Sequence, residues 1–167
     1  MPNEIIAALR DAMKNEMDGY HFYLMAAETM KDSKGKELFK ILADEEMMHL
    51  KFLEANYKSL RDTGKISPNA KLGDKHLFDG ENPLFSESIR DRIGDAHFEM
   101  TALSIAINLE LNTIKHYKGY ANHANDPEVK KFLEELVEWE TGHYDALLKQ
   151  DEALKEEYWE AAGFAPY

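Results

Sequence analysis

The chain has 167 residues, with 20 basic and 32 acidic side chains and a formal net charge of −12 at pH 7. This length suits one domain with a sizeable core, and the acidic balance argues against nucleic acid or an anionic membrane surface as a partner. Because there is no cysteine, disulfides, thiolate zinc sites, iron–sulfur clusters and cysteine nucleophiles are excluded. No apolar run reaches membrane-spanning length and no signal-peptide pattern is present, so we expect a soluble, cytoplasmic protein.

Apolar residues recur at helical spacing through residues 4–61 and predict a pair of long helices. Asn3 is a suitable N-cap for the first helix, and Glu16 is the one charged residue on its apolar stripe. A short turn over residues 32–35 makes the two helices antiparallel neighbours.

Residues 62–100 carry closely spaced turn signals and predict a long crossover, in which Ser86 caps a short helix to about Ile93. A crossover of this length lets the next helix run parallel to the last one. A continuous coiled coil is the alternative fold, and the number of helix breakers in this segment argues against it.

A second helix pair is predicted over residues 101–150, with Thr101 as the first N-cap and Asp126 followed by Pro127 as the second. A short amphipathic helix over residues 151–163 ends the chain. The predicted fold is therefore all-α, a single domain over residues 1–167 built as a four-helix bundle with a short C-terminal helix.

Each helix pair contains one Glu-x-x-His sequence on an apolar stripe, Glu46 with His49 and Glu140 with His143. Residues three apart project from one face of a helix, and burying a carboxylate with an imidazole is costly unless both are paired. These four side chains therefore need a partner inside the core.

An internal repeat of 94 residues relates the two helix pairs without a gap. Glu45 could also partner His49, but its counterpart is Trp139, so the repeat favours Glu46. The matched positions include Ala12 and Ala106, Glu16 and Glu110, Tyr23 and Tyr117, Asp32 and Asp126, Glu46 and Glu140, and His49 and His143.

The spacing places these groups at one height in the bundle. Glu16 precedes Asp32 and Glu46 follows it by similar numbers of residues, which puts both roughly 21–24 Å from the turn at about 1.5 Å per residue. Glu110 and Glu140 are related to Asp126 in the same way. We therefore expect four carboxylates and two imidazoles to converge at mid-height.

Metal explains this set best, because four buried carboxylates would otherwise repel one another and two divalent cations would balance their charge. Imidazole with carboxylate suits iron or manganese, and the ligand set does not distinguish the two. One Glu from each of two helices plus Glu-x-x-His from the other two is the known pattern of di-iron and di-manganese carboxylate bundles.

The stretches 15–23, 44–49 and 138–143 resemble the helix motifs of the ferritin-like superfamily and, within it, of the rubrerythrin-like proteins. The resemblance implies a non-haem site with two iron ions per four-helix unit, acting on peroxide or dioxygen, with Glu46 and Glu140 as bridging ligands. By position, the implied ligands are Glu16, Glu46, His49, Glu110, Glu140 and His143.

Two departures from rubrerythrins proper bear on the activity. Those proteins also hold iron on four cysteines, which this sequence lacks, so the electrons for any reduction would come from a separate donor. They also carry a further carboxylate one turn from the third-helix ligand, where this chain has Ile107 or Thr113. The second difference weakens the case for rubrerythrin-style peroxidase activity and leaves the dinuclear site intact.

Tyr23 and Tyr117 lie two turns after Glu16 and Glu110. We expect their hydroxyls to bind ligand carboxylates; a redox role is one alternative, and a purely structural role in the core is the other. The remaining histidines lack partners at ligand spacing and are expected on the surface or in loops, namely His21, His76, His97, His116 and His123.

The leading functional hypothesis is an oxidoreductase that reduces hydrogen peroxide or O2. The alternatives are a ferroxidase that oxidises Fe(II) and a non-catalytic scaffold stabilised by metal. We expect a homodimer or larger homo-oligomer, in which the long crossover would permit exchange of helix pairs between chains.

Overall fold

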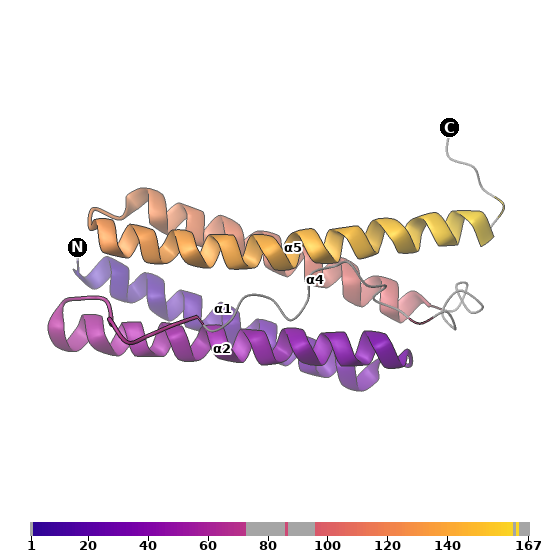
Figure 1. Cartoon of the computed structure of the whole chain (residues 1–167), viewed down its shortest axis with the longest axis horizontal. Coiled ribbons are helices and arrows are strands. Elements are labelled where there is room, and N and C mark those ends of the chain that lie inside the picture. The colour runs from indigo at the N-terminus through magenta and orange to yellow at the C-terminus, as the bar shows by residue number, and fades with distance from the viewer. Residues whose placement is uncertain (1, 73–85, 87–95, 162, 164–167) are drawn as a thin grey trace.

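The computed structural model describes residues 2–72, 86, 96–161 and 163, and these contain four α-helices and no strand. The helices are α1 (Pro2–Thr29), α2 (Ser33–Thr63), α4 (His97–His123) and α5 (Pro127–Ala161). Helices α1 and α2 form one antiparallel pair and α4 and α5 form the other, and the two pairs lie side by side (Figure 1). The predicted all-α four-helix bundle is confirmed. None of the described helices has the length and apolar character needed to cross a membrane.

Capping groups set both ends of α2. The Asp32 carboxylate accepts a hydrogen bond of 2.9 Å from the Gly35 amide, which satisfies a free N–H of the first turn. Gly64 ends the helix at φ 73°, a left-handed conformation that costs glycine little. Helix α1 begins at Pro2, so Asn3 lies inside the helix rather than before it.

The start of α4 differs from the prediction. The helix begins at His97, four residues before the predicted cap Thr101. The Thr101 hydroxyl donates to the His97 carbonyl at 2.7 Å, so it turns back into the helix and caps nothing. Ala96 is the actual N-cap residue and offers no side-chain hydrogen bond.

The predicted separate helix over residues 151–163 is wrong, because α5 continues without a break to Ala161. No proline or glycine interrupts residues 143–161, and the buried stripe carries on from Leu147 to Leu154. Lys155 and Asp151, one helical turn apart, form an ion pair just past the predicted junction. Helix propensity and packing therefore both favour continuation.

The two helices on either side of the long linker, α2 and α4, run in the same direction. Helix α2 ends at the left of Figure 1 and α4 begins at the right, so the two run parallel, as the long linker predicts. The predicted short helix after Ser86 lies outside the described residues. Ser86 itself donates its amide and its hydroxyl to the Asp32 carboxylate, and this fixes one point of the linker at the α1–α2 turn.

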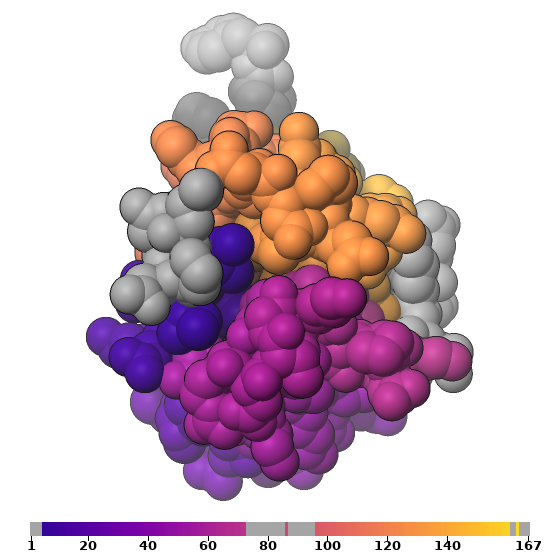
Figure 2. All heavy atoms as spheres, turned by 90° about the vertical axis from the view of Figure 1, so that its left-hand side faces the viewer, coloured from indigo at the N-terminus to yellow at the C-terminus, as the bar shows by residue number. Residues whose placement is uncertain are grey.

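Two apolar clusters fill the bundle on either side of its middle. One contains Tyr23, Phe39, Leu42 and Leu103, and the other contains residues nearer the opposite end, Leu9, Leu53, Tyr117, Phe132 and Leu136. A cavity of about 880 Å³ opens at the latter end, where α1 begins, α2 ends and α4 turns into α5. Figure 2 looks onto this end, with the start of α5 in orange above the end of α2 in magenta.

Candidate metal centre

The structure brings all six predicted ligand side chains together between the two apolar clusters. Helix α1 supplies one carboxylate, α4 supplies another, and α2 and α5 each supply a Glu-x-x-His pair. All six residues are at most 4% exposed. The contributing residues are Glu16, Glu46, His49, Glu110, Glu140 and His143.

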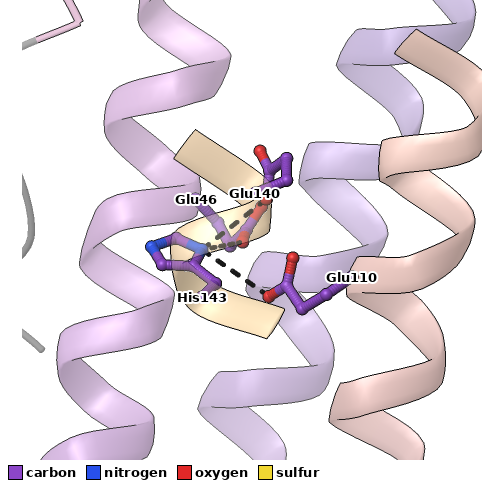
Figure 3. A group of neighbouring side chains, drawn as sticks. All are labelled: Glu46, Glu110, Glu140 and His143. Carbon is purple, nitrogen blue, oxygen red and sulfur yellow. Dashed lines mark ion pairs between the residues drawn. The ribbon is translucent and has the colours of Figure 1, made fainter. Parts of the chain in front are cut away.

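Their donor atoms form two overlapping groups. Atoms of Glu46, Glu110, Glu140 and His143 lie within 4.8 Å of one another (Figure 3), and so do atoms of Glu16, Glu46 and His49. Glu46 belongs to both groups. A carboxylate shared by two donor groups has the placement that a bridging ligand needs.

Glu140 lies between the two imidazoles. Its Oε1 is 3.0 Å from Nδ1 of His49, and its Oε2 is 3.6 Å from Nδ1 of His143. His49 Nδ1 also lies 3.2 Å from Oε2 of Glu16. The Nδ1 atoms of both histidines therefore face the carboxylates.

The donor set fits a pair of divalent cations. Both Glu140 oxygens are buried, and neither makes a hydrogen bond of good geometry in the described structure, although Oε1 lies 3.0 Å from Nδ1 of His49. Buried carboxylate oxygens are normally satisfied. Carboxylate and imidazole donors suit iron and manganese, and two cations would neutralise the four inner carboxylates.

Without cations, bound protons reduce the net negative charge of the cluster. Burial and the carboxylates of Glu16, Glu140 and Glu110 raise the pKa of Glu46 well above its usual value. Burial and Glu140 also raise the pKa of Glu110 to about 7. Although burial alone would lower it, contact with Glu140 and Glu16 raises the pKa of His49 to about 10.

The pKa of Glu140 shifts in the opposite direction from those of Glu46 and Glu110. Burial favours its neutral form, but the imidazoles of His49 and His143 outweigh burial and lower its pKa. The pKa of His143 is raised, because hydrogen bonds that its imidazolium donates to Glu110, Glu140 and Glu45 outweigh the effect of burial. Glu140 is therefore the anion that compensates two imidazolium groups when no metal is bound.

Tyr23 and Tyr117 bind the two single carboxylates reciprocally across the bundle. The Tyr23 hydroxyl of α1 donates to Glu110 of α4, and the Tyr117 hydroxyl of α4 donates to Glu16 of α1. Burial and the neighbouring carboxylates raise the pKa of both phenols well above the usual value. Both tyrosines therefore remain protonated donors, which is the hydrogen-bonding role expected from the sequence.

Glu45 also contacts the cluster, although the 94-residue repeat favours Glu46. It is fully buried, and its Oε2 lies 2.5 Å from Nε2 of His143. Trp139, at the equivalent position of the other pair, meets the ring of His49 edge-on with centroids 5.2 Å apart. The pair of adjacent glutamates at 45 and 46 was the available signal, and the repeat directed attention to only one of them.

A pocket of about 210 Å³ between α1 and α4 reaches the cluster at Glu46, Glu110 and Tyr23. Gly19 lines it, and a Cβ atom at this position would lie 3.2 Å from Oε2 of Glu46. The small residue thus leaves room for the Glu46 carboxylate beside α1. Other lining residues are Asn15, Asp18, Asn112, Thr113 and His116.

No carboxylate stands one turn from Glu110, as the sequence indicates. Ile107 packs against the core, and Thr113 lines the α1–α4 pocket. Four of the remaining histidines are exposed as predicted, namely His21, His97, His116 and His123. The fifth, His76, lies outside the described residues.

Fold and site together define a class: a bundle of two antiparallel helix pairs with carboxylates and imidazoles at mid-height is the arrangement of ferritin-like dimetal carboxylate proteins. A family model, Rubrerythrin, matches residues 7–151. The chain therefore belongs to the rubrerythrin family. A search of curated proteins and a search of solved structures each gave no match. Family membership indicates a di-iron carboxylate protein, and the buried Glu and His groups fit it.

Proposed function

We propose that this protein is an oxidoreductase that holds two iron ions and reduces hydrogen peroxide or O2 with electrons from a separate donor. The observation that carries the proposal is the pair of donor groups joined through Glu46 in the bundle interior. Glu46, Glu110, Glu140 and His143 would hold one ion, and Glu16, Glu46 and His49 the other. When bound, the iron pair supplies the two electrons that peroxide reduction requires.

The side chains around the ions have separate roles. The inner carboxylates balance charge and accommodate changes in the oxidation state of iron. Tyr23 and Tyr117 hold the Glu110 and Glu16 carboxylates in place by donating a hydrogen bond to each. The apolar clusters on both sides restrict water, which strengthens the electrostatic interactions inside the site.

The pocket between α1 and α4 gives a small ligand a path to the cluster. Its volume of about 210 Å³ accommodates hydrogen peroxide or O2 and lies below the roughly 300–1,000 Å³ of sites for drug-sized ligands. The proposed oxidants are therefore small inorganic molecules.

Metal analysis and single-turnover kinetics test the proposal. Protein purified without chelator should contain two iron ions per chain, and the anaerobic ferrous protein should oxidise on peroxide addition faster than the same concentration of free Fe(II). A Glu140→Gln variant, which keeps the side-chain volume, should lose both properties. Oxidation no faster than that of free Fe(II) overturns the oxidoreductase proposal.

Ferroxidase activity is the second candidate, and the lining of the α1–α4 pocket favours it. Among the described residues, the lining includes the Asp18 carboxylate and no lysine or arginine, and such a path attracts cations rather than anions. In this role Fe(II) is the substrate and leaves as Fe(III). Continued oxidation beyond two Fe(II) per chain, without an added reductant, distinguishes the ferroxidase from an enzyme with resident iron.

A further inference from the structure

His49 and His143 differ in the residue that contacts each imidazole on the side facing away from the inner carboxylates. Glu45 and Trp139 occupy equivalent positions of the 94-residue repeat, and each directly precedes a shared carboxylate, Glu46 or Glu140. Both residues are buried. The repeat therefore keeps the inner ligands alike and changes the residue that supports each imidazole from the outer side.

Glu45 gives His143 a charged hydrogen-bond partner. The Oε2 atom of Glu45 accepts from Nε2 of His143 at 2.5 Å, and both side chains are completely buried. A donor hydrogen on Nε2 leaves the lone pair on Nδ1, the atom that faces Glu46, Glu110 and Glu140. A carboxylate in this position fixes the tautomer and makes the imidazole a stronger metal ligand.

Trp139 gives His49 no such partner. The indole and imidazole rings meet at 86°, and an indole carries a donor but no hydrogen-bond acceptor. Nε2 of His49 is buried without a hydrogen bond in the described structure. Packing orients this ring, but no carboxylate increases its basicity.

The inner donors do not account for the difference. His143 shares its donor group with Glu46, Glu110 and Glu140, and His49 lies beside Glu16, Glu46 and Glu140. Each imidazole therefore has three carboxylates beside it. The two metal positions differ in the residue behind each imidazole, Glu45 for His143 and Trp139 for His49.

We infer that the two metal positions are unequal: the position beside His143 binds a divalent cation more tightly and fills first, and Glu45 is the positioning residue responsible. This inference rests on the proposed dimetal site. One repeat position holds glutamate and its counterpart holds tryptophan. This difference thus gives two otherwise equivalent metal positions unequal affinities.

Anaerobic titration of the full-length, metal-free chain with Co(II) tests the inference, with binding followed by visible absorption and calorimetry. The unmodified chain should take up two ions in two resolved steps. Glu45→Gln should weaken the first step by about 10- to 100-fold and merge it with the second. Trp139→Phe, which keeps an aromatic ring against His49, should leave the first step unchanged.

Glu99→Gln is the matched control for loss of a buried carboxylate. Glu99 is 2% exposed and precedes Glu110 on α4 by three helical turns, about 16 Å. Its variant should bind both ions as the unmodified chain does. The reciprocal variant Trp139→Glu should strengthen the second step, and if it fails to fold, Glu45→Gln and Trp139→Phe still decide the matter.

Proton NMR of the Co(II) protein assigns the first position independently of affinity. Since Nε2–H of His143 is buried against Glu45, the first equivalent should produce one strongly shifted exchangeable imidazole resonance, which Glu45→Gln should lose or broaden. Two ions bound in one unresolved step of equal affinity, or a first step unaffected by Glu45→Gln, overturns the inference while the dimetal site stands. Absence of Co(II) binding overturns the proposed site and the inference together.

Discussion

The two helix pairs of this bundle are alike where they supply the six cluster residues and differ at several positions around them. The α1–α2 pair contributes Glu16, Glu46 and His49, and the α4–α5 pair contributes the same three residue types at the same spacing. At the turns, however, Asp32 is buried and bonded to Ser86, whereas Asp126 is exposed. One turn after the single glutamate, α1 has Gly19 and α4 has Thr113.

This contrast separates the residues that metal binding would require from the surrounding residues that would modify affinity, access and stability. Two cations need a symmetric set of charges and donors, so the six inner residues match across the repeat. The surrounding positions decide affinity, access and stability, and there the two pairs have diverged. Variants made at equivalent positions of the two pairs therefore measure these adjustments directly.

The largest contrast is expected between Glu140→Gln and Glu46→Gln in the metal-free protein. Glu140 is the counter-anion of two imidazolium groups, so its loss leaves buried positive charge and should cost about 3–5 kcal/mol of unfolding free energy. Glu46 has a raised pKa because burial and three carboxylates oppose its charge, so its neutral replacement should change stability by less than about 1 kcal/mol. Urea denaturation measures both values.

Both variants should also lose binding of the metal pair, which Co(II) titration checks. The equal loss of metal then serves as the internal control for the unequal loss of stability. Similar unfolding free energies for the two metal-free variants would contradict the charge distribution described for the cluster.

The next largest effect concerns the residues that precede α2 and α5, Asp32 and Asp126. Asp32→Ala should cost about 2 kcal/mol, the upper part of the range for N-caps, because Asp32 also accepts hydrogen bonds from Ser86. Asp126→Ala removes one exposed bond to the Glu128 amide and should cost about 0.5–1 kcal/mol. Thermal unfolding of the two variants measures the difference, and a larger loss for Asp126→Ala would contradict it.

The Asp32 cap should also respond to pH. Burial would raise the pKa of Asp32, but hydrogen bonds from Ser86 and Gly35 outweigh it and lower the pKa from 3.8. A lowered pKa contributes stability that is complete above the unfolded value and is lost as the pH falls through the folded value. The stability gap between the unmodified chain and Asp32→Asn, about 1 kcal/mol at pH 7, should therefore close below about pH 4.

Denaturation of both proteins at pH 7, 5 and 3 measures this gap. Comparing the difference between two chains removes the titration of the buried cluster, which both share. A gap of the same size at pH 3 would show that the carboxylate charge of Asp32 contributes nothing.

The smallest expected effect compares two helical glycines. Gly119→Ala has no atom within 4 Å of the new Cβ and should stabilise the protein by about 0.5–1 kcal/mol, since alanine favours the helix. Gly19→Ala places its Cβ 3.2 Å from the Glu46 carboxylate, so it should gain less and should weaken Co(II) binding several-fold. Unchanged metal binding in Gly19→Ala would show that Glu46 does not need this space.

The meeting of the six side chains was predictable because its signal lies in spacing. Glu16 and Glu46 fall at one height only if the turn lies near Asp32, and the 94-residue repeat supplies a second copy of the same relation. Periodicity and turn chemistry therefore sufficed to place all four helices and to bring six side chains together.

Glu45 was missed because its role depends on how the two pairs are rotated against each other. Its carboxylate meets His143, a residue 98 positions away on another helix, and helical periodicity within one segment carries no such information. The repeat even argued against it, because Trp139 stands at the matched position.

The helix ends were missed for a different reason. Thr101 resembles a cap by residue type, yet its hydroxyl bonds back to His97. Residues near 150 are polar, yet Leu154 continues the buried stripe of α5. Local composition does not reveal which of two compatible hydrogen bonds forms or how far packing extends a helix.

The reciprocal bonds of Tyr23 to Glu110 and of Tyr117 to Glu16 give the bundle an approximate internal twofold relation. Each helical hairpin carries half of the cluster residues together with the tyrosine that binds a carboxylate of the other hairpin. Two copies of the first hairpin, docked by a twofold axis, would present the same six residue types and both phenols. The bundle thus has the arrangement of a homodimer of hairpins within a single chain.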